Sequence, residues 1–226
     1  MSRSLHTDPY ALRAARRIVA PYRRRADEPR VARRWARLGR RPSAAACAAA
    51  DSAGGPPTLI DVRVCPPRPE FLHPASADDV ARSLAFFGPA VVYGLHRVEL
   101  RQGVGDNRSG LLIAGLQVPG VVVLFEQPRP PWMIAGRLTT DSSQRLQRAG
   151  AHITVTASIT RVDWPAQTLR DFVLFDGLLH EIGHHLIQHR AGKRAARVMR
   201  TVDHERRADA FAAACRRAWT TGAAPR

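Results

Sequence analysis

Residues 178–189, LLHEIGHHLIQH, hold four histidines and one glutamate. His180 and His184 are four residues apart, and Glu181 directly follows the first of them. Residues i and i+4 lie on one face of an α-helix, so the two imidazoles can bind one metal ion, and imidazole suits zinc. Glu181 lies one step round the helix, where it can reach a water on the metal as a general base. The spacing therefore predicts a zinc site with a neighbouring base.

The other two histidines of this segment cannot join the pair while the helix continues. His185 is rotated by about 100° from His184, and His189 by about 180° from His180, on a helix of 3.6 residues per turn. We interpret both as surface or supporting residues. A third ligand must therefore come from another segment.

The segment DHERRADAFAAAC offers that ligand on a final helix predicted at roughly 203–219. Glu205 and Asp209 are spaced i and i+4 on it, so they share one face. Glu205 would complete a His₂Glu site with a fourth position open for water. Asp209 would then accept a hydrogen bond from the outer ring nitrogen of a ligand histidine. His204 is a rival third ligand, but only Glu205 has a carboxylate at i+4.

His180-Glu-x-x-His184 followed by Glu205-x-x-x-Asp209 resembles the gluzincins, the zinc metallopeptidases of the thermolysin type. The segments LLHEIGHH and ERRADAFA are similar to the corresponding segments of small ImmA/IrrE-type members. The resemblance covers about residues 150–219. It implies zinc-dependent hydrolysis of peptide bonds in a protein or peptide substrate, with the alternating segment AHITVTASIT as a strand along the cleft. It also implies these roles: His180, His184 and Glu205 as zinc ligands, Glu181 as catalytic base and Asp209 as a support.

The pattern departs from related groups at several points. A metzincin would need a histidine where this chain has Arg190, so that class is excluded. No helix-turn-helix module, which often accompanies ImmA/IrrE-type proteins, is identifiable. No residue of the sequence can be named as the group that stabilises the oxyanion.

The elements that would position these residues follow a helix, sheet, helix, helix order. A helix begins at a capping box of Ser76 and Asp79 and stops at Gly88-Pro89. A second begins at a similar pair, Thr168 and Asp171, and runs to about Arg190. Strands are predicted at 58–65, 96–102, 110–118, 120–127 and 151–162. The fold predicted is α+β: a minimal zincin-like domain with a small, mostly antiparallel sheet packed on the active-site helix and the glutamate helix.

The charge of the chain is concentrated before this domain. The formal net charge is +16, and residues 1–42 carry thirteen arginines against three acidic residues. We predict an Arg-rich helical extension and linker at 1–55, with helices at 8–22 and after Pro29, and the metallopeptidase domain at 56–226. The extension is either a solvated tail or an anion-binding arm. The alternative function is therefore a nucleic-acid-binding protein with a structural or vestigial zinc site.

The cysteines and the apolar stretches indicate the cellular compartment that we expect. Cys47, Cys65 and Cys215 are far apart and form no C-x-x-C pair, which favours a reducing compartment. Neither a signal-peptide core nor an apolar run long enough to cross a bilayer is present. We expect a soluble, cytoplasmic protein, and the sequence indicates no oligomeric state.

Overall fold

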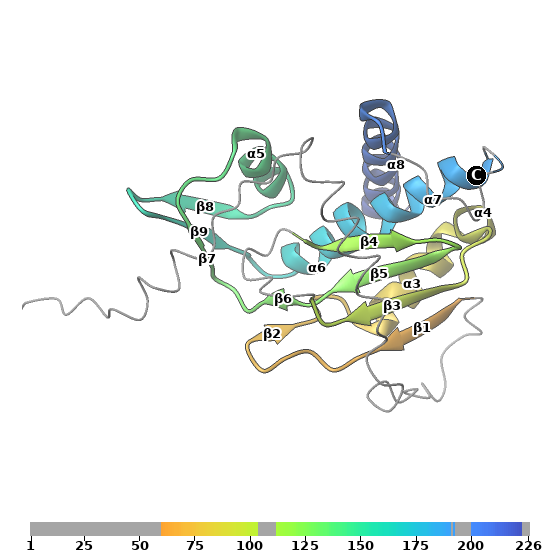
Figure 1. Ribbon diagram of the computed structural model, residues 1–226, viewed down its shortest axis with the longest axis horizontal. Coiled ribbons are helices and arrows are strands. Elements are labelled where there is room, and N and C mark those ends of the chain that lie inside the picture. The colour runs from red at the N-terminus through yellow and green to blue at the C-terminus, as the bar shows by residue number, and fades with distance from the viewer. Residues whose placement is uncertain (1–59, 104–111, 191, 193–199, 223–226) are drawn as a thin grey trace, which may run out of the picture. The chain divides into compact units, whose positions relative to one another are not determined.

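The computed structural model describes residues 60–103, 112–190, 192 and 200–222 (Figure 1). The predicted extension at 1–55, with its two helices, lies outside the described residues. Within the described range the chain is α+β, as predicted. It divides into two compact units, one containing Pro130–Pro165 and the other containing the described residues of 60–129 and 166–222.

The larger unit is built on a four-stranded sheet with the order β1-β3-β5-β4. Its strands are β1 (Asp61–Val64), β3 (Arg97–Arg101), β4 (Ala114–Gln117) and β5 (Val121–Phe125). All five residues of β5 are buried, so this strand is the centre of the core. A short antiparallel pair, β2 (Phe71–Leu72) and β6 (Gln127–Pro128), accompanies the sheet.

This sheet is mixed, and the prediction of a mostly antiparallel sheet is wrong for it. β1 pairs with β3, and β3 with β5, in parallel, while β4 is antiparallel to β5. The helices α3 (Ala77–Phe87) and α4 (Pro89–Val92) connect β1 to β3. Such a helical crossover returns the chain in the same direction and so produces parallel strands. The predicted capping box of Ser76 and Asp79 begins α3, and Gly88 ends it.

The smaller unit holds a three-stranded antiparallel sheet with the order β7-β9-β8. It comprises β7 (Trp132–Ala135), α5 (Thr140–Arg148), β8 (His152–Val155) and β9 (Ile159–Asp163). The single strand predicted at 151–162 is therefore wrong, because the chain reverses at Thr156. The backbone N–H and the hydroxyl of Thr156 both donate to the carbonyl of Ile159, and the Ile159 N–H donates back to the hydroxyl. These bonds close a tight turn within the alternating pattern.

The predicted helix at 168–190 forms with an irregular first half. It comprises α6 (Thr168–Phe172), the π-helical segment η2 (Val173–Leu179) and α7 (His180–Arg190). Its N-cap is Gln167, so the capping box predicted at Thr168 does not form. The π-helical segment ends directly before His180, and such segments are frequent at functional sites. From His180 onward the helix is α-helical, which is the geometry that the spacing argument assumed.

The last helix, α8 (Val202–Thr221), begins at the N-cap Thr201, whose hydroxyl accepts a hydrogen bond from the His204 N–H. α8 packs on both η2 and α7. Towards its end Trp219 makes ring contacts with Phe86 and Phe87 of α3 and with Phe175 of η2. These aromatic contacts fix α8 against the rest of the unit.

Two further expectations concern cysteines and membranes. Cys65 is disulfide-bonded, whereas Cys215 is free and buried. No helix in the described part of the chain has the length and apolarity needed to span a bilayer.

Candidate metal centre

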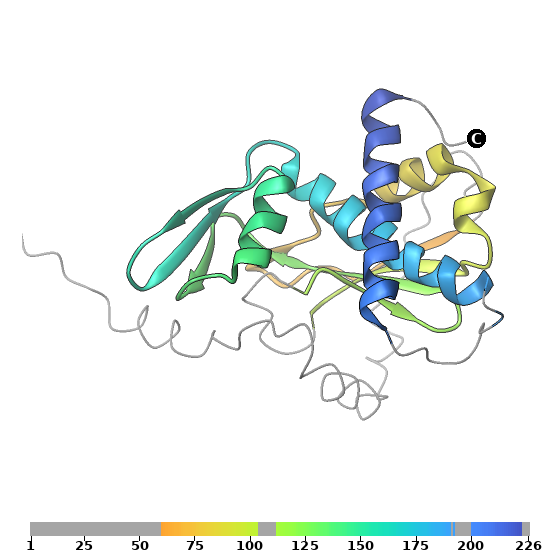
Figure 2. The same ribbon diagram turned by 90° about the horizontal axis from the view of Figure 1, so that it is seen from above.

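The site is built where α8 crosses α7 (Figure 2). Gly183 allows the crossing to be close: a Cβ built on it would lie 3.1 Å from the Cα of Ala208 and 3.2 Å from the Phe211 ring. Both Gly183 and Ala208 are buried. Glu205 and Asp209 flank Ala208 on α8, so the crossing brings their carboxylates onto the histidines of α7.

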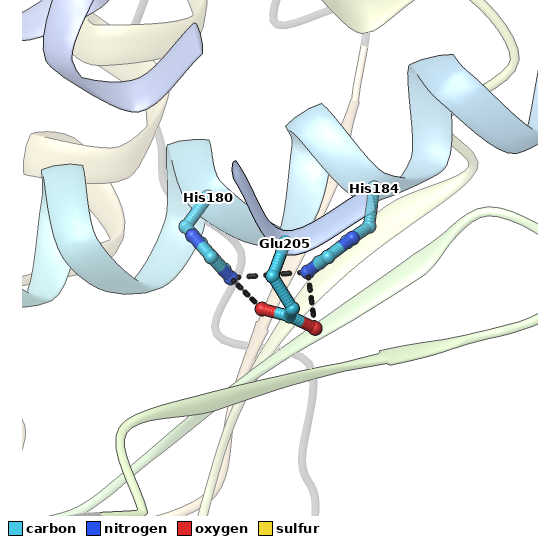
Figure 3. Close-up of side chains that lie close together, drawn as sticks. All are labelled: His180, His184 and Glu205. Carbon is cyan, nitrogen blue, oxygen red and sulfur yellow. Dashed lines mark hydrogen bonds and ion pairs between the residues drawn. The ribbon is translucent and has the colours of Figure 1, made fainter. Parts of the chain in front are cut away.

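Three of the predicted residues converge there (Figure 3). The Nε2 atoms of His180 and His184 lie 3.0 Å apart, and each lies 3.4 Å from an oxygen of the Glu205 carboxylate. The ligand atoms of this group all lie within 4.8 Å of one another. Four ligands placed tetrahedrally around zinc at about 2.05 Å would be about 3.3 Å apart. The two imidazole nitrogens are close to that separation, and the carboxylate completes a His₂Glu donor set, so the residues fit a zinc ion.

Asp209 lies where a supporting carboxylate would be needed. Its Oδ1 is 3.0 Å from Nδ1 of His180, the ring nitrogen that faces away from Glu205. A carboxylate on the outer nitrogen of a ligand histidine fixes the orientation and the tautomer of the ring. Burial opposes protonation of this ring, but the hydrogen bonds with Asp209 and Glu205 outweigh it and raise the pKa of His180 to about 9.

The other two members of the group differ from His180 in charge: the His184 ring is neutral and the Glu205 carboxylate is negative. Burial lowers the pKa of His184, which leaves its ring neutral and able to bind a metal. Burial works against ionisation of Glu205, but the hydrogen bonds with His180 and His184 outweigh it and hold the pKa of that carboxyl well below its usual value. Without a metal, the site thus pairs a charged His180 with a charged Glu205. The Nδ1 atom of His184 is buried and has no hydrogen-bond partner among the described residues.

Glu181, the predicted base, is buried and bound by an arginine that sequence reasoning missed. Arg200 donates from Nη1 to Oε1 of Glu181 at 3.3 Å and from Nη2 to Oε2. The same Nη1 lies 4.0 Å from Oε1 of Glu205. No motif marks Arg200 in the sequence, because it is one of many arginines and precedes the last helix. Only the N-cap at Thr201, directly after it, could have placed it near the start of α8.

The remaining histidines stay outside the metal group. His185 and His189 turn towards the loop after α4, as their rotation predicted: Nε2 of His185 lies 3.1 Å from the Tyr93 carbonyl oxygen, and the His189 ring stacks edge-on against the Tyr93 ring. The rival ligand His204 is buried with its ring centroid 4.9 Å from that of His184. Its nitrogens are not among the ligand atoms that converge.

Comparison with known proteins identifies no relative: no family model, no curated protein and no solved structure matches this chain. The functional interpretation therefore depends on the residues and on their geometry.

Proposed function

We propose that this protein is a zinc metallopeptidase of the gluzincin type, similar to the small ImmA/IrrE-type members. The observation that carries the proposal is the convergence of one ligand atom each from His180, His184 and Glu205 within 4.8 Å of one another, in a donor set that suits zinc. Zinc itself is part of the proposal, as are the roles of the individual residues.

The number of ligands favours catalysis over a structural role. Structural zinc sites are usually closed by four protein ligands, often cysteines, whereas catalytic sites keep a position open. Among the described residues the group has three protein ligands, and the free Cys215 does not belong to it. This donor set favours a position for water beside the buried Glu181.

The chemistry divides between the metal and the chain. Zinc would act as a Lewis acid that makes a water molecule more acidic and polarises the carbonyl of the substrate. Glu181 takes a proton from the attacking water and passes it to the leaving amine. Asp209 keeps the His180 ring turned so that Nε2 faces Glu205. Glu205 provides the negative charge that offsets part of the charge of the cation.

A peptide or protein is the substrate that the surrounding sheet favours. β4 is the edge strand of the four-stranded sheet, and it packs against α7, the helix of His180 and His184. An extended peptide can add to such an edge through main-chain hydrogen bonds. We assign this role to β4, because β4 contacts the helix that carries both histidines.

The first experiment measures zinc per chain in the wild type, Glu205→Ala and Glu181→Gln, together with hydrolysis of an unstructured protein such as casein. We expect about one zinc in the wild type, a clear loss in Glu205→Ala, and full zinc without hydrolysis in Glu181→Gln. Asp203→Ala is the matched control, because this exposed carboxylate also lies in the first turn of α8. A wild type that contains no zinc after reconstitution would rule out the proposal.

The alternative is a nucleic-acid-binding protein in which the zinc is structural or vestigial. The charge of residues 1–42, thirteen arginines against three acidic residues, favours it. Full zinc without hydrolysis in the wild type, with DNA binding that depends on residues 1–42, would support this alternative. Cytoplasmic location stays a prediction.

A further inference from the structure

The contacts of Arg200 differ from those of an ordinary surface ion pair. Its guanidinium donates hydrogen bonds to both carboxylate oxygens of Glu181. Glu181 is buried, with 6% of its side chain exposed. Two parallel N–H donors fix the plane of a carboxylate as well as its position. A single contact would leave Glu181 free to rotate, whereas this pair defines which way its oxygens face.

The position of the guanidinium also relates Glu181 to the metal group. Nη1 of Arg200 lies 3.3 Å from Glu181 and 4.0 Å from Glu205, so one nitrogen lies between the carboxylate of the base and the carboxylate of a ligand. The guanidinium therefore offsets the repulsion between two carboxylates in a partly buried site.

We infer that Arg200 is a positioning residue for the base: it holds the Glu181 carboxylate beside the group formed by His180, His184 and Glu205. This inference rests on the proposed function, because Glu181 needs a fixed orientation only if it transfers a proton. Arg200 reaches the site from the residue directly before the N-cap of α8. The start of that helix therefore supplies a ligand, Glu205, and the residue that positions the base.

The simpler interpretation is that the Arg200–Glu181 pair only fastens the start of α8 to α7. The two interpretations differ in what Arg200→Ala changes. A fastening residue would lower the zinc content in step with activity. A positioning residue would affect kcat, while the zinc content and KM stay close to those of the wild type.

The test compares Arg200→Ala, Arg200→Lys and the control Arg206→Ala, an exposed arginine of α8 that pairs with Asp203. We expect kcat to fall by about tenfold to a hundredfold in Arg200→Ala, because a misplaced catalytic group costs about that much. Lysine keeps the positive charge but cannot make the two parallel hydrogen bonds, so the kcat of Arg200→Lys should lie between those of Arg200→Ala and the wild type. Arg206→Ala should match the wild type. Unchanged kcat in Arg200→Ala, or loss of zinc in step with activity, would overturn the inference.

A second readout does not depend on hydrolysis. Thermal midpoints of the metal-free wild type, Arg200→Ala, Glu181→Gln and the double variant form a double-mutant cycle. We expect the double variant to be shifted by less than the sum of the two single shifts. Additive shifts would mean that the two side chains do not interact, and would overturn the inference even for an active enzyme. An inactive wild type with non-additive shifts would instead contradict the proposed function, and the pair would be structural.

Discussion

His180 carries the proton that a metal has to displace. With a pKa of about 9 it is charged at neutral pH in the metal-free protein, held between Asp209 and Glu205. Because this pKa lies above the ordinary value of 6.5, the pairing stabilises the metal-free fold below about pH 6.5 and is lost as the pH rises through about 9. A bound metal needs the neutral ring, so metal binding and deprotonation of His180 are coupled.

Zinc binding is therefore expected to release about one proton per ion at pH 7, and the apparent affinity should rise with pH up to about 9. Isothermal titration calorimetry in two buffers of different ionisation enthalpy measures that release directly. Zinc uptake without proton release at pH 7 would mean that His180 is neutral before the metal binds.

Replacing Asp209 by Asn is expected to lower zinc affinity by about tenfold to a hundredfold, because the charged partner of His180 Nδ1 is lost while the ligands stay. Competition against a chelator measures the change. Asp203→Asn is the control, since that carboxylate pairs with Arg206 on the exposed face of α8. Equal affinities in both variants would show that Asp209 does not support the ligand.

At the scale of elements, the crossing of α7 and α8 decides whether the ligands meet. The pair His180 and His184 is local to α7, and the pair Glu205 and Asp209 is local to α8, but the distance between the pairs depends on how closely the helices approach. Gly183 sets that approach, since any side chain there must displace the backbone of Ala208 or the ring of Phe211.

Gly183→Leu is expected to destabilise the protein by about 1–3 kcal/mol through overpacking and to lower zinc content, because it separates Glu205 from His180 and His184. Denaturant unfolding and metal analysis on the same preparation test both effects. Ala213→Leu, which introduces the same side chain on the exposed face of α8, should change neither. A Gly183→Leu variant that binds zinc normally would mean that the crossing tolerates a wider separation.

At the scale of the whole molecule, the charge is distributed very unevenly. Removing residues 1–42 takes away thirteen arginines and three acidic residues, so the formal net charge falls from +16 to +6. Electrostatic binding to a polyanion depends on such charge and weakens with salt.

Deleting residues 1–42 is expected to weaken binding to duplex DNA and to flatten its dependence on salt concentration, while zinc content stays the same. Fluorescence anisotropy between about 50 and 200 mM salt covers the range in which such binding changes most. Equal affinity of the two proteins at low salt would remove the case for an anion-binding arm.

The sequence alone determined the parts of the site that lie within one helix. His180 and His184, and likewise Glu205 and Asp209, share a face because the helical repeat puts residues i and i+4 together. The exclusion of His185 and His189 follows from the same repeat, which holds because the π-helical segment ends at Leu179. The capping box at Ser76 is equally local, since its two partners are three residues apart.

Only the tertiary structure decided the relations between segments. The parallel pairing of β1, β3 and β5 depends on a crossover between distant strands, and the turn at Thr156 competes with an alternation that by itself indicates one long strand. Arg200 contacts Glu181 across 19 positions of the chain, a contact that no periodicity encodes. Helical spacing depends on neighbouring residues, whereas the distance from Glu205 to His180 and His184 depends on how α8 packs against α7.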